Sequence, residues 1–139
     1  MEAITSIMRA QQILLARLNE LLGPLNLTFP RYEALMLLSF TKAGTLPMGK
    51  VGERLQVHRT SVTNIIDKLE ADGLVRRVPH EADRRTTLAE ITDAGRDVAG
   101  RATELLNADA FGLDALGEDE QEQLTALLRM LRLEAGDFE

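Results

Sequence analysis

A row of short polar and basic side chains recurs at helical spacing in segment 58–73, which reads HRTSVTNIIDKLEADG. Hydroxyl and amide groups of this length can hydrogen-bond to the edges of DNA bases, and basic groups can reach guanine or a phosphate. The candidate contacts are Arg59, Thr60, Ser61, Thr63, Asn64 and Lys68. An ordinary solvated helix face would carry similar groups, so the surrounding elements must decide between the two interpretations.

The same segment has a regular apolar side, made by Val62, Ile65, Ile66 and Leu69. This spacing predicts one amphipathic helix whose polar row faces outward. A DNA major groove is about 12 Å wide and admits one helix, provided that its outer side chains are short. We expect His58 to be an N-cap or turn residue, and Gly73 to close the helix in the usual C-terminal position.

A second basic cluster lies in the charged turn HEADRR, between the segments LVRRV and TTLAEI. The first segment is short and β-branched, and the second alternates as a half-buried strand does. Together they predict a β-hairpin with Arg84 and Arg85 at its tip, where arginine suits the narrow, negative minor groove. Plain surface charge is the alternative. Of Arg76 and Arg77, at most one can face DNA well, because neighbouring strand residues point to opposite sides.

The chain offers little for catalysis or metal binding. It has no Cys, and its two histidines, His58 and His80, lie far apart in the sequence without ligand spacing. An enzyme would need a nucleophile with a base, or a metal, and a metal-sensing repressor would need clustered ligands. We therefore predict no catalytic residues, no metal and no cofactor.

Charge is distributed unevenly along the 139 residues, whose net charge is −6. Residues 102–139 hold ten acidic and two basic side chains, whereas residues 1–101 hold twelve and fourteen. The middle of the chain is therefore free to be locally basic. The N-terminal apolar run is interrupted by Glu2, Arg9 and Arg17, and no segment is long enough to span a bilayer. These features predict a soluble cytoplasmic protein with no membrane partner.

The elements around these clusters follow a recognisable order. Helices are predicted over 3–22, from about residue 28 through YEALMLLSF, around Val51 and Leu55, over 58–73, from the Thr92 cap to about 110, and over 118–135. The segment TKAGTLP is expected to be a loop or a short extended piece. Two short helices joined by a tight turn, and then a hairpin, form a winged helix-turn-helix. The predicted fold class is mainly α with a small β-hairpin.

Three segments resemble the MarR family of bacterial transcription regulators: LTFPRYEALMLLSF, VGERLQVHRTSVTNIIDKLEADGLVRR and DRRTTLAEITDAGR. The most specific parts are the wing element DRR-x5-[LI]-T and the helix ending L-E-x-x-G-L-V. Two departures stand out: many members have Pro where this chain has Arg59, and Leu-Thr where it has Ile91-Thr92. The first is expected to alter base preference.

The resemblance implies one MarR-like domain over 1–139, with its winged helix-turn-helix at 28–92. It implies a sequence-specific regulator of double-stranded DNA, with repression as the expected outcome, and it implies that Asp83 orients the wing arginine near DNA. A winged helix that only binds protein is the rival. Such a module would not need the polar face of 59–68 together with Arg84 and Arg85.

A homodimer is expected, because one recognition helix reads only a few base pairs and specific operators present two half-sites. The terminal helices are more apolar than a winged helix needs, so 1–22 and 96–135 are predicted to form an α-helical dimerisation region. The alternative is that they only complete the monomer core. The candidate interface residues are Ile4, Ile7, Leu124, Leu127, Leu128 and Leu131.

The resemblance also implies a small effector, often an aromatic or phenolic anion, bound between the dimer helices and the winged helix. The residues expected there are Leu14, Arg17, Phe29, Arg31 and Tyr32, which could equally be core and surface. The absence of Cys argues against the thiol-oxidising branch of the family.

Overall fold

The computed structural model describes residues 1–137, and this part of the chain contains six α-helices and one three-stranded sheet. The helices are α1 (Glu2–Leu22), α2 (Phe29–Ser39), α3 (Met48–Leu55), α4 (Arg59–Ala71), α5 (Asp93–Ala108) and α6 (Glu118–Glu134), with short 3-10 helices η1 (Gly23–Leu25) and η2 (Ala110–Gly112). The strands are β1 (Thr45–Pro47), β2 (Val75–Pro79) and β3 (Thr87–Ile91). The predicted mainly α fold with a small β-hairpin is confirmed.

The sheet has the order β1-β3-β2, and both pairs of strands are antiparallel. The β2–β3 hairpin, called the wing below, pairs Val75 with Ile91 at its base and Pro79 with Thr87 near its tip. Pro79 lies at the end of an outer strand, where the missing backbone N–H costs no ladder hydrogen bond. The segment expected to be a loop or a short extended piece contributes β1 as the third strand.

The core lies between α2, α4 and α5 and extends to the base of the wing. Helix α4 buries Val62, Ile66 and Leu69 as its spacing predicted, so its polar row faces outward. At the approach of α3 to α4, a Cβ built on Gly52 would lie 3.1 Å from Val62 Cγ2. A larger side chain at this glycine would therefore push the two helices apart.

The ends of α4 are set by local hydrogen bonds. Gln56 has a left-handed conformation (φ +55°) that turns the chain out of α3. The Nδ1 atom of His58 accepts the backbone N–H of Thr60 at 3.2 Å, which confirms the expected N-cap. At the other end, Gly73 (φ +74°) allows the Leu74 N–H to donate to the Leu69 carbonyl at 2.9 Å. At the start of α2, Thr28 has a side chain of the capping type but makes no cap bond; Asn19 Oδ1 instead accepts the Phe29 N–H at 2.7 Å.

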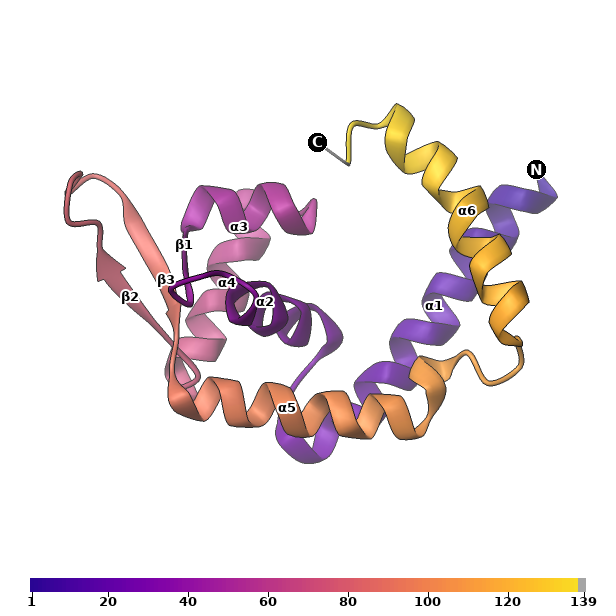
Figure 1. The fold of residues 1–139 in the computed structure, drawn as a ribbon, viewed down its shortest axis with the longest axis horizontal. Coiled ribbons are helices and arrows are strands. Elements are labelled where there is room, and N and C mark those ends of the chain that lie inside the picture. Colours follow the sequence, from indigo (N-terminus) through magenta and orange to yellow (C-terminus); the bar gives the residue numbers. More distant parts are fainter. Residues whose placement is uncertain (138–139) are drawn as a thin grey trace.

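Figure 1 shows that the wing and the α1–α6 region lie at opposite ends of the molecule, joined by α5 along the bottom of the view. Helix α1 reaches the core through Leu18 and Leu22. In the described residues, α6 has no buried side chain. Of the six predicted interface residues, four are exposed (Ile4, Leu124, Leu127 and Leu131) and two are half-buried (Ile7 and Leu128). Within residues 1–137, no helix is long and apolar enough to cross a membrane.

Candidate nucleic-acid interface

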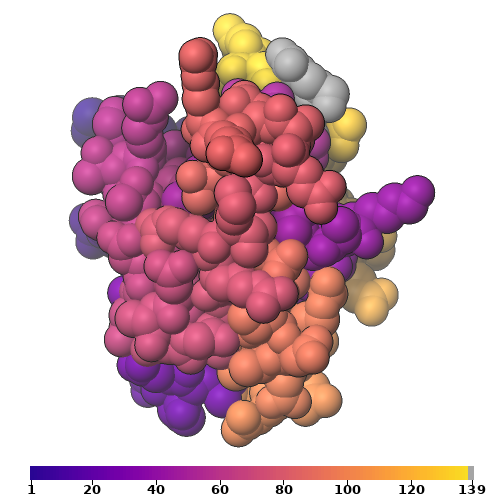
Figure 2. Space-filling view, turned by 90° about the vertical axis from the view of Figure 1, so that its left-hand side faces the viewer, coloured from indigo at the N-terminus to yellow at the C-terminus, as the bar shows by residue number. Residues whose placement is uncertain are grey.

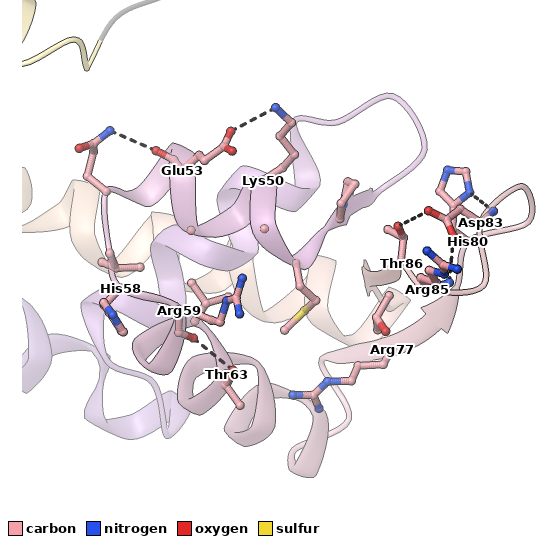
Figure 3. Close-up of a pocket in the computed structure, with 18 residues that line it drawn as sticks. Lys50, Glu53, His58, Arg59, Thr63, Arg77, His80, Asp83, Arg85 and Thr86 are labelled. Carbon is pink, nitrogen blue, oxygen red and sulfur yellow. Dashed lines mark hydrogen bonds and ion pairs between the residues drawn. The ribbon is translucent and has the colours of Figure 1, made fainter.

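Helix α3, the N-terminal half of α4 and the wing enclose an open groove with a cavity volume of about 1400 Å³. In Figure 2, α4 and the wing make up most of the face turned toward the viewer, with α5 at its lower right. Figure 3 shows Arg59 and Thr63 from α4 on one side of the groove and Asp83 and Arg85 from the wing on the other. The two candidate clusters of the sequence therefore face one another across this groove.

The nine residues predicted to contact DNA differ in whether they line this groove. Four of them line it, namely Arg59, Thr63, Asp83 and Arg85. Four others are exposed outside its lining, namely Thr60, Ser61, Asn64 and Arg84. The ninth, Lys68, is half-buried near the C-terminal end of α4, where its ammonium lies 3.4 Å from Asp72 Oδ1. Its predicted contact with DNA requires this pair to open.

The outer face of α4 carries a hydroxyl and an amide group that can hydrogen-bond to DNA bases. The Thr63 hydroxyl donates to the Arg59 carbonyl at 3.2 Å, one helical turn back. Its lone pairs and methyl group stay available, so Thr63 can accept from a base amino group or contact a thymine methyl. Asn64 is exposed, and an amide in this position can pair with adenine.

Basic side chains in this region fall into two classes. Among the described residues, the guanidinium groups of Arg59, Arg84 and Arg85 have no hydrogen-bond or ion-pair partner. Arg76 and Arg77, by contrast, are paired: Arg76 with Glu90 on the neighbouring strand, and Arg77 with two carboxylates of α4. These three arginines can therefore bind phosphate without first breaking an internal contact.

The turn at the wing tip is fixed by two side chains. Asp83 Oδ1 accepts the backbone N–H of Arg85 at 3.0 Å, and its Oδ2 accepts the Thr86 hydroxyl at 3.2 Å. His80 Nδ1 accepts the backbone N–H groups of Ala82 and Asp83 at 3.1 and 3.2 Å. Asp83 therefore holds the backbone that carries Arg85.

Sequence reasoning did not assign His80 or Lys50 to this groove, and both of them line it. His80 is a structural acceptor inside the wing turn, and no sequence signal distinguishes it from any other isolated histidine. Lys50 of α3 lines the groove and pairs with Glu53 at 3.1 Å. Lys50 could have been predicted, because the first helix of a helix-turn-helix crosses the DNA backbone and a basic residue on it can contact phosphate.

The five residues predicted to bind an effector form two separate sets of contacts. On α2, Tyr32 is buried with its hydroxyl 2.7 Å from Thr103 Oγ1, and its ring centroid lies 5.8 Å from that of Phe29. Arg31 is half-buried on the same helix.

On α1, Arg17 donates two hydrogen bonds to the Asp109 carboxylate, at 3.1 and 2.8 Å. These contacts lower the pKa of Asp109 from its ordinary value. Leu14 lies beside Gly112, where a built Cβ would approach its Cδ2 to 3.1 Å. In this conformation the Arg17 guanidinium is therefore already occupied by a carboxylate.

Comparison with known proteins finds the same family in the family models, the curated relatives and the solved structures. A model of the MarR family matches residues 25–86. The organic hydroperoxide resistance transcriptional regulator of Bacillus subtilis is 32% identical over 111 residues, which are 80% of this chain and 74% of that protein. The crystal structure of Sco5413, a MarR family transcriptional regulator from Streptomyces coelicolor, superposes with a TM-score of 0.93 at 54% identity, covering 99% of this chain and 96% of Sco5413. A mutant of MarR from Escherichia coli, solved with operator DNA, gives 0.81 at 25% identity over 91% of each chain.

Proposed function

The chain belongs to the MarR family of transcriptional regulators, and on that premise we propose that it acts as a homodimeric repressor on a pseudo-palindromic operator. As a regulator of this family it is not an enzyme. The structure of MarR from Escherichia coli contains operator DNA, and this chain shares its fold over most of its length. That relationship supports DNA as the partner of the groove described above.

One observation carries the proposal: the unpartnered Arg59 and Arg85 line opposite sides of a groove, with Thr63 beside Arg59. The exposed side chains of Thr60, Ser61 and Asn64 continue the polar outer face of α4. Exposed arginine without an internal partner is suited to phosphate, and short hydroxyl and amide groups are suited to base edges. A module that binds only protein needs neither. In the proposed complex, α4 enters the major groove, and the wing reaches the backbone or the adjacent minor groove.

The dimer is part of the same proposal. Two α4 helices must lie about one DNA turn apart, roughly 34 Å, to read both half-sites from one side of the duplex. The exposed apolar residues of α1 and α6 lie at the end of the molecule away from the wing (Figure 1). A second copy joined there would leave both wings free. Residues 1–22 and 96–135 are the proposed dimerisation region.

Footprinting on DNA flanking the gene for this protein tests the function directly, because it reports DNA binding, half-site spacing and symmetry together. Protection of two half-sites about one helical turn apart is the expected pattern. Binding with no sequence preference would contradict the proposal.

Two variants should separate base reading from phosphate binding. Asn64→Ala is expected to relax the preference at one base position per half-site, where a good base contact contributes about 1–3 kcal/mol. Arg85→Ala is expected to leave base preference unchanged and to make the slope of log affinity against log salt shallower by about two, since each neutralised phosphate contributes about 0.9 and the dimer has two wings. Titrations of cognate and single-site mutant duplexes at several salt concentrations measure both quantities.

Each of these variants is the control for the other. If Asn64→Ala weakened binding to all duplexes equally, its base-reading role would be wrong. If Arg85→Ala left both affinity and slope unchanged, with normal melting, the wing would not touch DNA. Arg84→Ala is the third variant. Its neighbour Arg85 also donates its backbone N–H to Asp83, whereas Arg84 does not, so Arg84→Ala removes a wing arginine at a residue that does not make this turn contact.

We further propose that a small aromatic or phenolic anion releases the DNA. The support is the family membership and the position of Phe29 and Tyr32 on α2 beside α5, which links the winged helix to the α1–α6 region. Addition of such an anion to the same titration should lower DNA affinity, and Tyr32→Phe should change its midpoint. A broad screen of phenols and aromatic acids at millimolar concentration that left affinity untouched would contradict the effector.

A further inference from the structure

Helix α4 carries two carboxylates that should disfavour DNA. Asp67 and Glu70 are exposed and lie on the flank of α4 that faces the wing, as their shared contact with the wing arginine Arg77 shows. A negative group beside the phosphate backbone repels it and lowers affinity at low salt. If α4 binds DNA, the negative charges of Asp67 and Glu70 must therefore be neutralised by a cation that remains bound to them.

Arg77 of β2 supplies that cation through three contacts. Its Nη2 lies 2.5 Å from Asp67 Oδ1, and its Nη1 lies 2.7 Å from Glu70 Oε1. Its backbone N–H also donates to Glu70 Oε2 at 3.0 Å. The Arg77 side chain is only 27% exposed, compared with 66% for Arg76 on the opposite side of the strand. A planar guanidinium is suited to bridging two carboxylates in this way.

These contacts fasten the wing to the recognition helix at a second point. The first point is the turn at Gly73, which leads directly from α4 into β2. Strand β1 holds the β3 side of the hairpin as far as Leu88, whereas β2 is an outer strand of the sheet. Arg77 is the side chain that ties this outer strand to α4. At about 3.3 Å per strand residue, the wing tip lies on the order of 15 Å beyond Arg77.

Because the wing tip lies this far from Arg77, a small rotation of the hairpin is enough to break a contact between a tip arginine and a phosphate. A swing of about 10° over that length moves the tip by about 2–3 Å, which exceeds the narrow range of hydrogen-bond distances. The arginines at the tip can hold a phosphate only if the hairpin keeps its angle to α4.

We propose that Arg77 is the positioning residue of the wing: it holds the tip arginines at the right distance from DNA and neutralises Asp67 and Glu70, without binding DNA itself. This inference rests on the proposed DNA-binding function. It distinguishes Arg77 from the tip arginines Arg84 and Arg85, which have no internal partner among the described residues.

The test is a double-mutant cycle in DNA titrations of the full chain, with Arg77→Gln made in the wild type and in the Arg84→Ala/Arg85→Ala background. In the wild type, Arg77→Gln should weaken operator binding about tenfold, because both wings of the dimer lose their placed phosphate contacts. In the background without tip arginines, the same change should cost less than about threefold, because only the unmasked charge of Asp67 and Glu70 then opposes DNA and no tip arginine remains to be positioned. Arg76→Gln, which removes the neighbouring arginine on the other side of β2, is the matched control and should change affinity little.

A second variant keeps the result independent of folding. Arg77→Lys retains the positive charge, but a single ammonium cannot bridge two carboxylates as the fork of arginine does. It should therefore show an intermediate loss that again depends on the tip arginines, with an unchanged melting temperature. A simple phosphate contact would instead tolerate lysine.

The outcomes separate the two proposals. Equal losses from Arg77→Gln in both backgrounds, or no loss in either, would overturn the positioning role. Absence of operator binding by the wild type in the same titration would overturn the proposed function instead.

Discussion

Replacing Leu127 and Leu131 of α6 with glutamate should convert the proposed homodimer into a monomer and weaken operator binding about a thousandfold or more. A specific dimer–operator complex has a dissociation constant of about 10⁻⁸–10⁻¹¹ M, and a monomer keeps only half of its contacts. Since every 1.4 kcal/mol is about tenfold, losing half of the binding free energy removes several orders of magnitude. Analytical ultracentrifugation and DNA titration measure the two effects on the same samples.

The reason lies in the surface of α6. Leu127 and Leu131 are 64% and 57% exposed, and in the described residues this 17-residue helix buries no side chain. An isolated helix of this length is marginal in water, so α6 needs a partner surface. Apolar burial stabilises by about 25 cal/mol per Å², and a glutamate placed in such an interface must be desolvated without a partner.

The control is Gln123→Glu, which adds a glutamate to the same helix at an exposed polar residue. It should remain dimeric and bind the operator normally. The Leu127→Glu/Leu131→Glu variant should keep most of its helical circular dichroism, because neither residue belongs to the monomer core. A dimer that persists in this variant at micromolar concentration would show that α6 is not the interface.

The sequence predicted those parts of the fold that depend on local periodicity. The apolar side of α4 was predicted from spacing alone: Val62, Ile66 and Leu69 are buried, and Ile65 is half-buried against the same core. The ends of α4 were equally predictable, since His58 and Gly73 are residue types that begin and end helices. The hairpin followed from alternation and a charged turn. These signals are all local, because each is contained within one short segment of chain, residues 58–73 or residues 74–91.

What the sequence could not predict depends on contacts between segments. Arg77 was identified as basic, but whether it faced DNA or protein depended on two carboxylates of α4, Asp67 and Glu70. The spacing of Lys68 and Asp72 on one helix allowed an ion pair between them to be predicted. The sequence alone did not show whether Lys68 binds Asp72 or a DNA phosphate. Strand β1 was left open between loop and strand because three residues show no periodicity, and their partner β3 lies more than 40 residues later.

The glycine at the start of α5 is a further case, because its importance is invisible in the sequence. Segment 93–96 reads DAGR, and nothing in it separates Gly95 from a glycine tolerated on a helix surface. In the structure, Gly95 is buried, and a Cβ built on it would lie 2.1 Å from the Leu74 carbonyl oxygen and 2.8 Å from Ile91 Cγ1. The backbone of α5 thus touches the backbone at the base of the wing, which only glycine permits.

Gly95→Ala should therefore destabilise the protein strongly. The Leu74 carbonyl accepts the Thr92 N–H at 3.0 Å, and Thr92 Oγ1 caps α5 by accepting the Gly95 N–H at 3.0 Å. Relieving the clash requires moving α5 away from this point, which strains both hydrogen bonds. Overpacking alone costs about 1–3 kcal/mol, and a lost N-cap about 1 kcal/mol more. For a chain of this size the midpoint of thermal unfolding should fall by about 10 °C.

Gly100→Ala is the control that isolates this close approach from the general effect of replacing glycine in a helix. Gly100 lies on the same helix, is exposed, and a Cβ built on it meets nothing within 4 Å. Alanine there should stabilise the protein by about 0.5–1 kcal/mol, because glycine is the poorer helix former. Thermal melts of both variants at one fixed protein concentration give the comparison, since the melting temperature of a dimer depends on concentration. If Gly95→Ala melted within a degree or two of the wild type, the contact between α5 and the wing base would not be the constraint that holds this glycine.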